Sequence, residues 1–325
     1  MLRIGLLGAS KIAVPAVIAP ASKMAGVTVV AVAARDLQKA KTYADTHSIA
    51  AVCADYEALL ARDDVDLVYN GLPPSAHAPW TIAALRAGKA VLCEKPFCMD
   101  AGQAAQMVAA ASASGRALIE AYHYRFHPMF EHLMTLLADN AIGAVQNIDA
   151  HFNIGIQNPP GELRYVPTLG GGAMMDLGCY PLHWVRMVAG SEPTVHDAKA
   201  RWHDSGVDDA MRASLTFADG VSASIACDMS ASLPHEIDAA LTITGSTGRI
   251  HIDNPIAPHK GYTFELTQGG HSQQVRLPDD NHTTYWYQLQ HVLAVLHGER
   301  QPVTGGADAV NTMRAIDAIY AAARV

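Results

Sequence analysis

The sequence is poor in aromatic and charged residues. Phe, Trp and Tyr account for 6% of its 325 residues and Asp, Glu, Lys and Arg for 17%, while hydrophobic residues make up 50%. So large an apolar share excludes a disordered or fibrous chain. Much of it is Ala and Val, which favour close packing of helices on sheets, so an α/β fold is indicated. At roughly 100–200 residues per domain, the length predicts two domains.

Long hydrophobic runs and paired cysteines are also missing. The longest apolar candidate, 12–21, is interrupted by Pro15 and Pro20 and is shorter than the ~20 residues of a membrane span. The first residues lack the apolar core of a secretion signal. The five cysteines form no C-x-x-C pair, which argues against a disulfide framework and favours a reducing compartment. We expect a cytoplasmic protein without a membrane partner.

Positive charge is in the minority. Lys and Arg total 23 against 31 for Asp and Glu, so the formal net charge is −8, and there is no basic block. Such a chain is a poor nucleic-acid binder by bulk electrostatics, and we expect a small-molecule partner instead. The 16 histidines show no spacing typical of metal ligands, so no metal site is predicted.

The first 121 residues alternate predicted strands and helices. Short apolar runs are separated by Ala-rich stretches of helical length, as in a parallel sheet that is buried on both faces. Gly26, Gly88 and Gly115 each stand where a helix ends and the next strand begins. Residues 1–121 are therefore predicted to form a doubly wound α/β domain. Its predicted strands are 2–7, 27–33, 65–69, 90–93 and 117–121, and its predicted helices include 79–87 and 101–114.

Beyond residue 122 the pattern changes to successive hairpins. Runs 211–217 and 221–227 are joined by Ala218-Asp219-Gly220, and two further pairs of runs meet at glycines. Residues 122–325 are accordingly predicted to form an α+β domain with a large antiparallel sheet. Its last helix, 307–323, either stays in this domain or packs back on the first. The other predicted elements are strands 145–156, 240–244, 249–252, 262–267 and 273–277 and helix 285–297.

A glycine-rich turn follows the first predicted strand. Gly8 and Ala13 match the first and last positions of the pattern G-x-G-x-x-G/A, whereas Ser10 replaces the middle glycine. In that pattern the first glycine permits a tight turn, and free N–H groups at the helix start bind a pyrophosphate. The alternative is a plain strand-to-helix turn. The residues predicted to bind a dinucleotide here are Gly8, Ala9, Ser10, Lys11 and Ile12.

The end of the second strand bears on the choice between NAD and NADP. An NAD site usually has an acid here to bind the ribose 2′-OH, but the sequence has Ala34 followed by Arg35. A guanidinium can pair with the 2′-phosphate of NADP, and Lys11 and Lys39 add positive charge, so NADP is preferred. In the alternative, Arg35 is a solvated cation and Asp36 only caps the next helix.

Polar residues follow three further strands of the predicted parallel sheet. Ligands bind beyond the carboxyl ends of such strands. A lysine held by a following proline, as in Glu94-Lys95-Pro96, can lie beside a reacting carbon–oxygen group and lower the pKa of a hydroxyl. The alternative is a structural ion pair with Glu94 or another acid. Leu72, Pro73 and His77 follow predicted strand 65–69 and are predicted to contact the cofactor. Tyr124 and Arg125 follow predicted strand 117–121.

Together these motifs resemble the Gfo/Idh/MocA (glucose-fructose oxidoreductase / inositol dehydrogenase) family. The resemblance rests on the glycine turn, on Glu94-Lys95-Pro96 and on segments 124–128 and 170–180, and it covers nearly the whole chain. It implies a Rossmann domain followed by a domain with a mostly antiparallel open sheet. It also implies hydride transfer between NAD(P) and a sugar, polyol or related secondary alcohol, in a homodimer or homotetramer.

The resemblance carries catalytic roles to individual residues. Lys95 takes the place of the family's catalytic lysine, with Glu94 and Pro96 beside the cofactor. Asp176 and Tyr180 take the places of the family's Asp-x-x-x-His pair, with tyrosine where histidine usually stands. That exchange resembles the branch of the NADP-dependent xylose dehydrogenases and dimeric dihydrodiol dehydrogenases, in which tyrosine is the acid/base. Lys95, Tyr180 and Asp176 are therefore the predicted catalytic residues.

Substrate contacts are predicted for four further residues. Arg164 fits a family position that commonly contacts substrate, although Leu163 replaces a frequent tryptophan there. Tyr124 and Arg125 belong to the motif after predicted strand 117–121. His183 lies near Tyr180 in the sequence and is both a substrate candidate and the alternative acid/base.

The spacing of the polar residues supports the assignment independently. Asp176, Tyr180 and His183 stand at i, i+4 and i+7, which is one face of a helix, although Pro181 disturbs a regular helix here. A tyrosine with an ordinary pKa of ~10 needs a nearby cation to act near neutral pH, and Lys95 would supply it.

The sequence thus predicts an NADP-preferring dehydrogenase or reductase acting on CH–OH groups of a sugar, polyol or dihydrodiol. Two alternatives are a non-enzymatic regulator that senses sugar or dinucleotide and an NAD-dependent glycosidase that oxidises its substrate transiently. Lys95 and Tyr180 together argue against a sensor, because a sensor needs no proton transfer. Arg35 argues against tightly held NAD.

Overall fold

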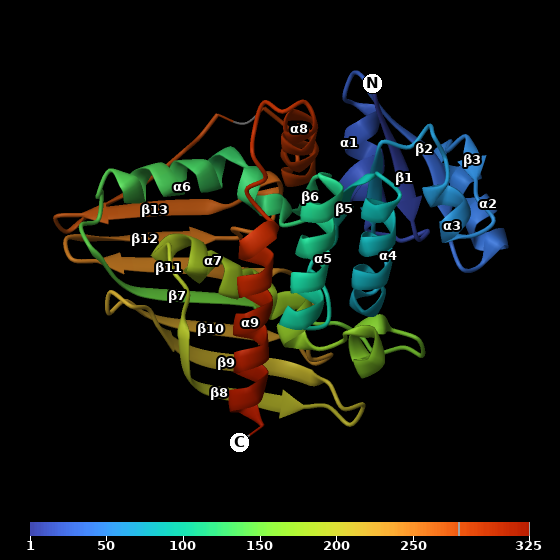
Figure 1. Cartoon of the computed structure of the whole chain (residues 1–325). Coiled ribbons are helices and arrows are strands. Elements are labelled where there is room, and N and C mark those ends of the chain that lie inside the picture. Colours follow the sequence, from blue (N-terminus) through green and yellow to red (C-terminus); the bar gives the residue numbers. More distant parts are fainter. Residues whose placement is uncertain (279, 325) are drawn as a thin grey trace. The chain divides into compact units, whose positions relative to one another are not determined.

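Residues 1–123 and 285–310 form one folding unit, and residues 124–284 with the chain from 311 onward form the other (Figure 1). The computed structural model describes residues 1–278 and 280–324. The division differs from the predicted one mainly in segment 285–310, because Leu289 and Val292 pack into the core of the first unit. The predicted domain boundary between residues 121 and 122 stays a prediction.

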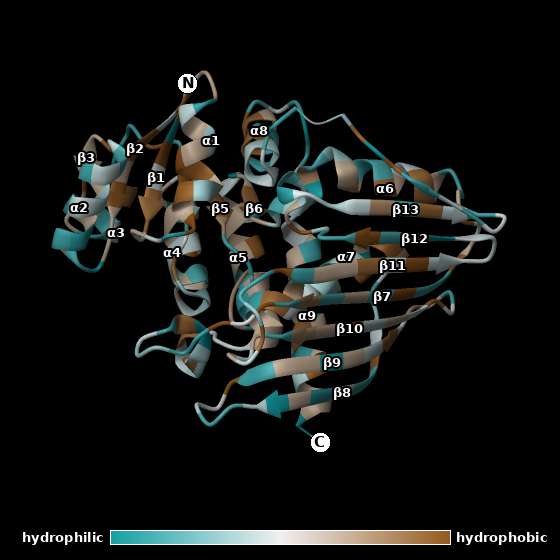
Figure 2. Ribbon diagram, turned by 180° about the vertical axis from the view of Figure 1, so that it is seen from behind, coloured by the Kyte–Doolittle hydropathy of each residue, from teal (hydrophilic) through white to brown (hydrophobic). Residues whose placement is uncertain are grey.

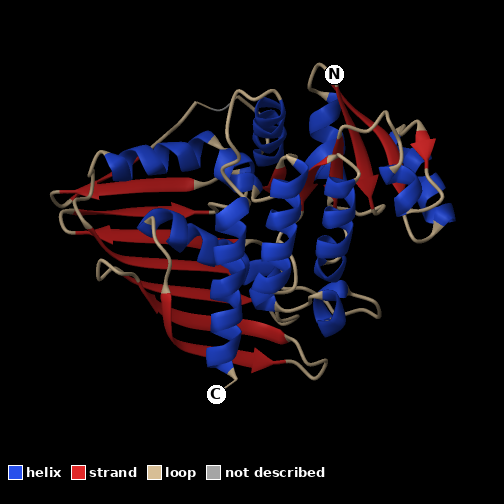
Figure 3. Ribbon diagram, viewed as in Figure 1, coloured by secondary structure: helices blue, strands red, loops and turns tan. Residues whose placement is uncertain are grey.

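The first unit is built on a six-stranded parallel sheet with the order β3-β2-β1-β4-β5-β6. Figure 3 distinguishes the strands, in red, from the helices, in blue. The predicted parallel sheet is confirmed, and strands 2–7, 27–33 and 90–93 have the predicted bounds. The strand order reverses beside β1, which pairs with both β2 and β4. The strands are β1 (Leu2–Leu7), β2 (Val27–Ala33), β3 (Ala51–Val52), β4 (Leu67–Asn70), β5 (Ala90–Cys93) and β6 (Leu118–Glu120).

Helices cover both faces of this sheet, as its continuous apolar strands require. On one face, Val17 and Leu289 pack with Ile4 and Leu6 in the main core. On the other face, a Cβ on Gly5 would come within 2.8 Å of a Leu59 methyl, so glycine permits the close approach. The helical segments are η1 (Val14–Ile18), α1 (Ala19–Ser22), α2 (Leu37–His47), α3 (Tyr56–Leu60), α4 (Pro74–Arg86), α5 (Ala101–Ser114) and α8 (Thr284–Leu296).

Local sequence signals set the ends of these helices. The side chains of Asp36 and Asp100 cap α2 and α5 by accepting backbone N–H groups at 3.0 Å and 2.8 Å. α4 begins at Pro74, earlier than predicted, because proline suits a first helical turn and Pro79 inside the helix removes only one hydrogen bond. In the two described ranges, no helix combines the length and the apolar sequence that crossing a membrane requires.

The second unit contains an eight-stranded sheet with the order β14-β13-β12-β11-β7-β10-β9-β8. Only β7 and β10 run parallel, so the predicted mostly antiparallel sheet is confirmed. β8 escaped prediction because this edge strand is largely exposed and lacks a clear alternation. The strands are β7 (Val145–Asn153), β8 (Thr194–Trp202), β9 (Asp208–Thr216), β10 (Ser222–Asp228), β11 (Asp238–Gly245), β12 (Gly248–Asp253), β13 (Thr263–Gln268) and β14 (His271–Gln274).

The two faces of this sheet differ. Helices α6 (Pro128–Ala138) and α7 (Cys179–Ala189), with the later part of α9 (Gly306–Ala323), lie over one face, where Ile148 and Phe152 are buried. Figure 2 shows the other face without helices. There Ser222 Oγ donates to Asn147 Oδ1 at 2.7 Å. The homodimer or homotetramer implied by the resemblance stays a prediction.

Candidate functional site

The glycine-rich turn lies at the carboxyl end of β1 and joins it to a helix. Gly8 has a φ of +92°, a conformation that favours glycine, and its N–H donates to Ala33 O at 2.8 Å. Ser10 Oγ accepts a hydrogen bond from Ala13 N at 3.3 Å, and Ser10 O accepts one from Tyr43 Oη at 2.9 Å. Neighbouring segments of the same unit therefore fix the turn before any ligand binds.

Arg35 follows Ala34 at the carboxyl end of β2. Ala34 is buried and Arg35 is exposed. The adjacent carboxylate of Asp36 accepts the N–H of Lys39 at 3.0 Å and so serves the helix. Across the described parts of the chain, no carboxylate forms an ion pair with Arg35. Its guanidinium can therefore pair with an anionic ligand.

Lys95 stands just past the carboxyl end of β5, between Glu94 and Pro96, with a cis peptide bond to Pro96. Glu94 is buried: its Oε1 accepts a hydrogen bond from Tyr69 Oη at 2.7 Å and its Oε2 accepts one from Lys95 N at 3.3 Å. Burial and the charge of Glu94 raise the pKa of Tyr69 well above its usual value, so the phenol stays protonated. Tyr69 was missed by sequence reasoning because it reads as part of an apolar strand.

His77 lies in the first turns of α4 and is 1% exposed. Its Nε2 is 2.7 Å from Leu72 O, and its Nδ1 is 3.0 Å from Pro96 O. Burial lowers the pKa of His77 to about 4, so the ring is neutral at physiological pH. Both ring nitrogens face backbone oxygens of the two neighbouring loops.

The residues predicted to bind the cofactor all lie at one edge of the first unit, because parallel strands have their carboxyl ends at the same edge. They fit a nicotinamide dinucleotide. A Cβ on Gly8 would come within 3.0 Å of Leu72 Cδ2, so the turn offers backbone in place of a side chain. Lys11 and Ile12 are exposed at the start of the following helix, and Arg35 provides the cation for a phosphate.

Asp176 and Tyr180 lie on one helical segment of the second unit, which starts as a π turn, Met174–Gly178, and continues as α7. Pro181 has no N–H to donate to the residue four positions earlier, and the wider turn directly precedes it. The regular helical spacing predicted for Asp176 and Tyr180 is therefore distorted. Gly178 lets this segment approach the sheet, because a Cβ there would come within 2.8 Å of Cys227 Sγ.

Tyr180 is 4% exposed and belongs to an aromatic cluster. Its ring centroid lies 5.7 Å from that of Phe152, 6.1 Å from that of Tyr124 and 6.3 Å from that of Trp184. Aromatic contacts on several sides restrict the ring to one orientation. The position of its hydroxyl is therefore set by the helix and the sheet.

The other substrate candidates of the second unit surround this cluster. His183 and Tyr124 are fully buried, and His183 Nδ1 is hydrogen-bonded to Tyr124 Oη. The Cζ of Arg125 lies 5.3 Å from the ring centroid of Phe130, and its buried Nε has no hydrogen-bond partner in the described part of the chain. His127 has a different role, because it caps α6 by accepting a backbone N–H at 3.2 Å.

Asp176 is held by Arg164. The Nε of Arg164 donates to Asp176 Oδ2 at 2.5 Å, and its NH1 donates to Glu162 Oε1 at 3.0 Å. The charge of Asp176 raises the pKa of Arg164 further above its usual value, so the guanidinium stays charged. Arg164 and Asp176 therefore form a pre-oriented pair, and the predicted substrate residue Arg164 also positions a predicted catalytic one.

A buried carboxylate anchors the start of the same helical segment. Asp208 is 1% exposed, and it accepts hydrogen bonds from Met174 N at 2.7 Å and from Tyr320 Oη at 2.7 Å. A Cβ on Gly172 would come within 2.3 Å of Asp208 Oδ1, which explains a glycine at this point. Sequence reasoning missed Asp208, because no local pattern links positions so far apart.

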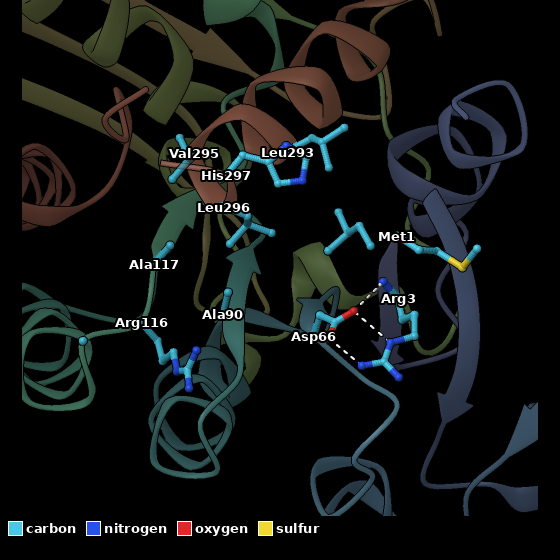
Figure 4. Close-up of a pocket in the computed structure, with 12 residues that line it drawn as sticks. Met1, Arg3, Asp66, Ala90, Arg116, Ala117, Leu293, Val295, Leu296 and His297 are labelled. Atoms are coloured by element: carbon cyan, nitrogen blue, oxygen red, sulfur yellow. Dashed lines mark hydrogen bonds and ion pairs between the residues drawn. The ribbon is translucent and has the colours of Figure 1, made fainter. Parts of the chain in front are cut away.

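A cavity of about 670 Å³ lies at the opposite edge of the first unit's sheet, at the amino ends of its strands (Figure 4). Arg3 and Asp66 in its wall form an ion pair at 2.7 Å, and Leu293 and Leu296 of α8 close one side. The residues that line it include none of the predicted site residues. The candidate site is therefore distinct from this cavity.

The chain matches two family models. Residues 2–122 match the oxidoreductase family with an NAD-binding Rossmann fold, and residues 130–251 match the GFO/IDH/MocA C-terminal domain. The first match covers all six strands of the parallel sheet, and the second covers β7 to β11 and the first part of β12.

Named relatives extend over most of the chain. The trans-1,2-dihydrobenzene-1,2-diol dehydrogenase of Xenopus tropicalis is 37% identical over 225 residues, which cover 69% of this chain and 66% of that enzyme. The D-xylose 1-dehydrogenase (NADP(+)) 2 of Haloferax volcanii is 31% identical over 319 residues, which cover 98% of this chain and 96% of that enzyme. A solved structure of the 3-ketoreductase KijD10 from Actinomadura kijaniata, in complex with NADP and TDP-benzene, matches at a TM-score of 0.88 and 30% identity. That match covers 98% of this chain and 97% of the ketoreductase.

The burial of Asp208 predicts a distinct pH dependence of stability. Burial raises its pKa to about 6 in the folded protein, so its favourable contribution is complete below pH 4 and is lost as the pH rises through 6. In Asp208→Asn, the amide can accept from Met174 N and donate to Tyr320. From pH 4 to pH 7, the free energy of unfolding should therefore shift by about 2 kcal/mol in favour of the variant over the wild type.

Urea unfolding of both proteins at several pH values measures this shift. Asp66→Asn is the control of opposite sign, because the hydrogen bond from Arg3 lowers the pKa of Asp66 and its carboxylate stabilises the fold at neutral pH. A constant offset between wild type and Asp208→Asn from pH 4 to pH 7 would contradict the prediction.

Proposed function

The chain belongs to the Gfo/Idh/MocA oxidoreductase family, and we propose that it is an NADP-preferring dehydrogenase or reductase for a secondary alcohol or carbonyl group. The observation that carries this proposal is the shared edge of the parallel sheet, which holds the glycine turn, Arg35 and Lys95 at the carboxyl ends of β1, β2 and β5. The names of the relatives support a sugar or a dihydrodiol as the substrate, and the resemblance seen in the sequence adds polyols to the classes to be tested.

In the proposed reaction, oxidation removes a hydride from the substrate carbon and a proton from its hydroxyl, and the carbon–oxygen bond becomes double. Hydride exchange is the chemistry that a bound nicotinamide dinucleotide supplies. Proton exchange belongs to the chain: Tyr180 Oη takes the hydroxyl proton in oxidation and returns it in reduction. In this proposal, Lys95 supplies the positive charge that a tyrosine needs to act as an acid/base near neutral pH.

The remaining residues orient the substrate. Asp176, held by Arg164, accepts a hydrogen bond from a neighbouring substrate hydroxyl. Tyr124 and His183 support the ring of Tyr180 through their own hydrogen bond, and Arg125 offers its guanidinium to the substrate. His183 is the second choice for the acid/base, because its ring is fully buried and engaged with Tyr124.

A substrate panel tests the proposal. The purified protein is incubated with NADP or NAD and with aldoses, polyols and trans-dihydrodiols, and in the reverse direction with NADPH and ketosugars. Formation or loss of the reduced cofactor is followed by absorbance. We expect turnover with at least one class and a preference for NADP; no turnover with any class in either direction contradicts the proposed function.

Lys95→Met should lower kcat by about 10²–10⁴-fold, because it removes the cation that tunes the acid/base and keeps a similar volume. The dissociation constant for NADP should stay within about threefold of the wild-type value, since uncharged parts of the site are untouched. Lys89→Met is the matched control: Lys89 Nζ donates to Arg62 O at 2.6 Å, before β5 begins and away from the strand ends that carry the site. Unchanged kcat in Lys95→Met would refute the role of Lys95.

Tyr180→Phe should lower kcat by about 10²–10⁴-fold and keep the aromatic packing, because only the hydroxyl is lost. The control is Tyr165→Phe, which removes another buried hydroxyl of the second unit, one that donates to Ile156 O at 3.0 Å. Steady-state kinetics of both variants are compared with those of His183→Asn. Near-normal kcat in Tyr180→Phe, with a large loss in His183→Asn, would transfer the acid/base role to His183.

Arg35→Ala should raise KM for NADP by about 10–100-fold, since a charge-assisted hydrogen bond contributes roughly 1.5–3 kcal/mol. KM for NAD should change little, because NAD carries no 2′-phosphate. Lys41→Ala, which removes an exposed cation of α2, is the control. Equal effects of Arg35→Ala on both cofactors would show that Arg35 does not read the 2′-phosphate.

A further inference from the structure

We propose that His77 is a positioning residue for Lys95, which it influences by joining the loop after β4 to the Lys95–Pro96 segment. The inference rests on the proposed function of Lys95. It assigns His77 an indirect role in place of the direct cofactor contact that the sequence predicts.

The backbone pairing of β4 and β5 ends just before the functional loops. The last pairs are Tyr69 with Leu92 and Asn70 with Cys93, and Glu94 N still donates to Asn70 O at 3.0 Å. Beyond this point the two chains separate into the turn before α4 and the segment that carries Lys95. A side chain can link the two loops beyond this point.

The ring of His77 provides such a link. Nε2 lies 2.7 Å from Leu72 O in the loop after β4, and Nδ1 lies 3.0 Å from Pro96 O, one residue after Lys95. The backbone of His77 is itself fixed, because Asn70 Nδ2 donates to His77 O at 3.2 Å and to Thr81 Oγ1 at 3.1 Å. The imidazole thus extends from α4, whose backbone is fixed at His77, to the space between the two loops.

The chemistry of imidazole suits this place. Its nitrogens lie on different sides of a rigid ring, so one side chain can address two backbone oxygens. Burial and the charge of Lys95 both lower the pKa of His77, so the ring is neutral. A neutral ring adds no second cation beside the ammonium of Lys95. It carries one N–H, which it donates to one of the two oxygens at a time.

A direct role in cofactor binding does not fit the same geometry. His77 is 1% exposed, and both of its nitrogens are directed at backbone oxygens. Its effect on the reaction must therefore pass through Leu72 or Pro96. Since Pro96 follows Lys95 directly, displacement of its carbonyl moves the lysine backbone.

The test compares His77→Leu, which fills the space without a hydrogen bond, with His77→Gln, whose amide N–H can reach one oxygen. We expect kcat of His77→Leu to fall about 10²-fold, as a small misplacement of a reacting group does, and that of His77→Gln to fall less. KM for the alcohol substrate should change less than kcat. The pH profile of kcat should shift in the same direction as in Lys95→Met. Lys89→Met is the control for loss of a side chain that holds a backbone carbonyl in this unit.

Two outcomes overturn the inference while the wild type turns over normally. The first is unchanged kcat in His77→Leu. The second is a fall in kcat that equals the loss of folded protein measured by thermal unfolding, while the pH profile of kcat is unshifted. Where His77→Leu does not fold, His77→Gln decides by the same two criteria. A wild type without turnover contradicts the proposed function itself, and this inference falls with it.

Discussion

The parallel alignment of six strands is the constraint on which the first unit depends. Each strand is an apolar run that must be covered on both faces, so helices connect the strands and every carboxyl end reaches the same edge. The turn at Gly8, the exposed guanidinium of Arg35 and the ammonium of Lys95 are thereby gathered from distant parts of the sequence. The backbone hydrogen bonds between the strands end at this edge. Beyond it, side chains such as those of Glu94 and His77 hold the loops that carry the site residues.

In the second unit, the site residues are positioned by one helix that packs closely on the sheet. Gly178 permits the helix of Tyr180 to approach β10, and Asp208 binds the start of that helix. The carboxylate of Asp208 is unfavourable in so buried a place, as its raised pKa records, but two hydrogen bonds partly offset this cost. Burial of Asp208 therefore lowers the stability of the fold but fixes the start of the helix that carries Tyr180, the proposed acid/base.

The sequence predicts what local patterns encode. Strands 2–7, 27–33 and 90–93 are continuous apolar runs and were predicted to the residue, whereas the exposed edge strand Thr194–Trp202 leaves no pattern. The residues of the candidate site also fall into those that a local pattern predicts and those that it does not. Lys95 and Arg35 are visible from their place after a strand, but the bonds of Tyr69 to Glu94 and of Tyr320 to Asp208 join residues 25 and 112 positions apart. Such bonds depend on the tertiary fold.

Net charge is a poor guide to ligand binding because a single cation without an acidic partner can bind an anion whatever the total charge is. Arg3, Arg62, Arg164, Arg186 and Arg201 each form an ion pair with a carboxylate. Arg35 has no described carboxylate as an ion-pair partner, and it stands at the carboxyl end of a strand. An anion that reaches this edge meets an uncompensated charge, whereas one that reaches Arg164 must compete with Asp176 and Glu162. A chain with a formal charge of −8 can thus bind a phosphate-bearing cofactor at one place without a basic surface.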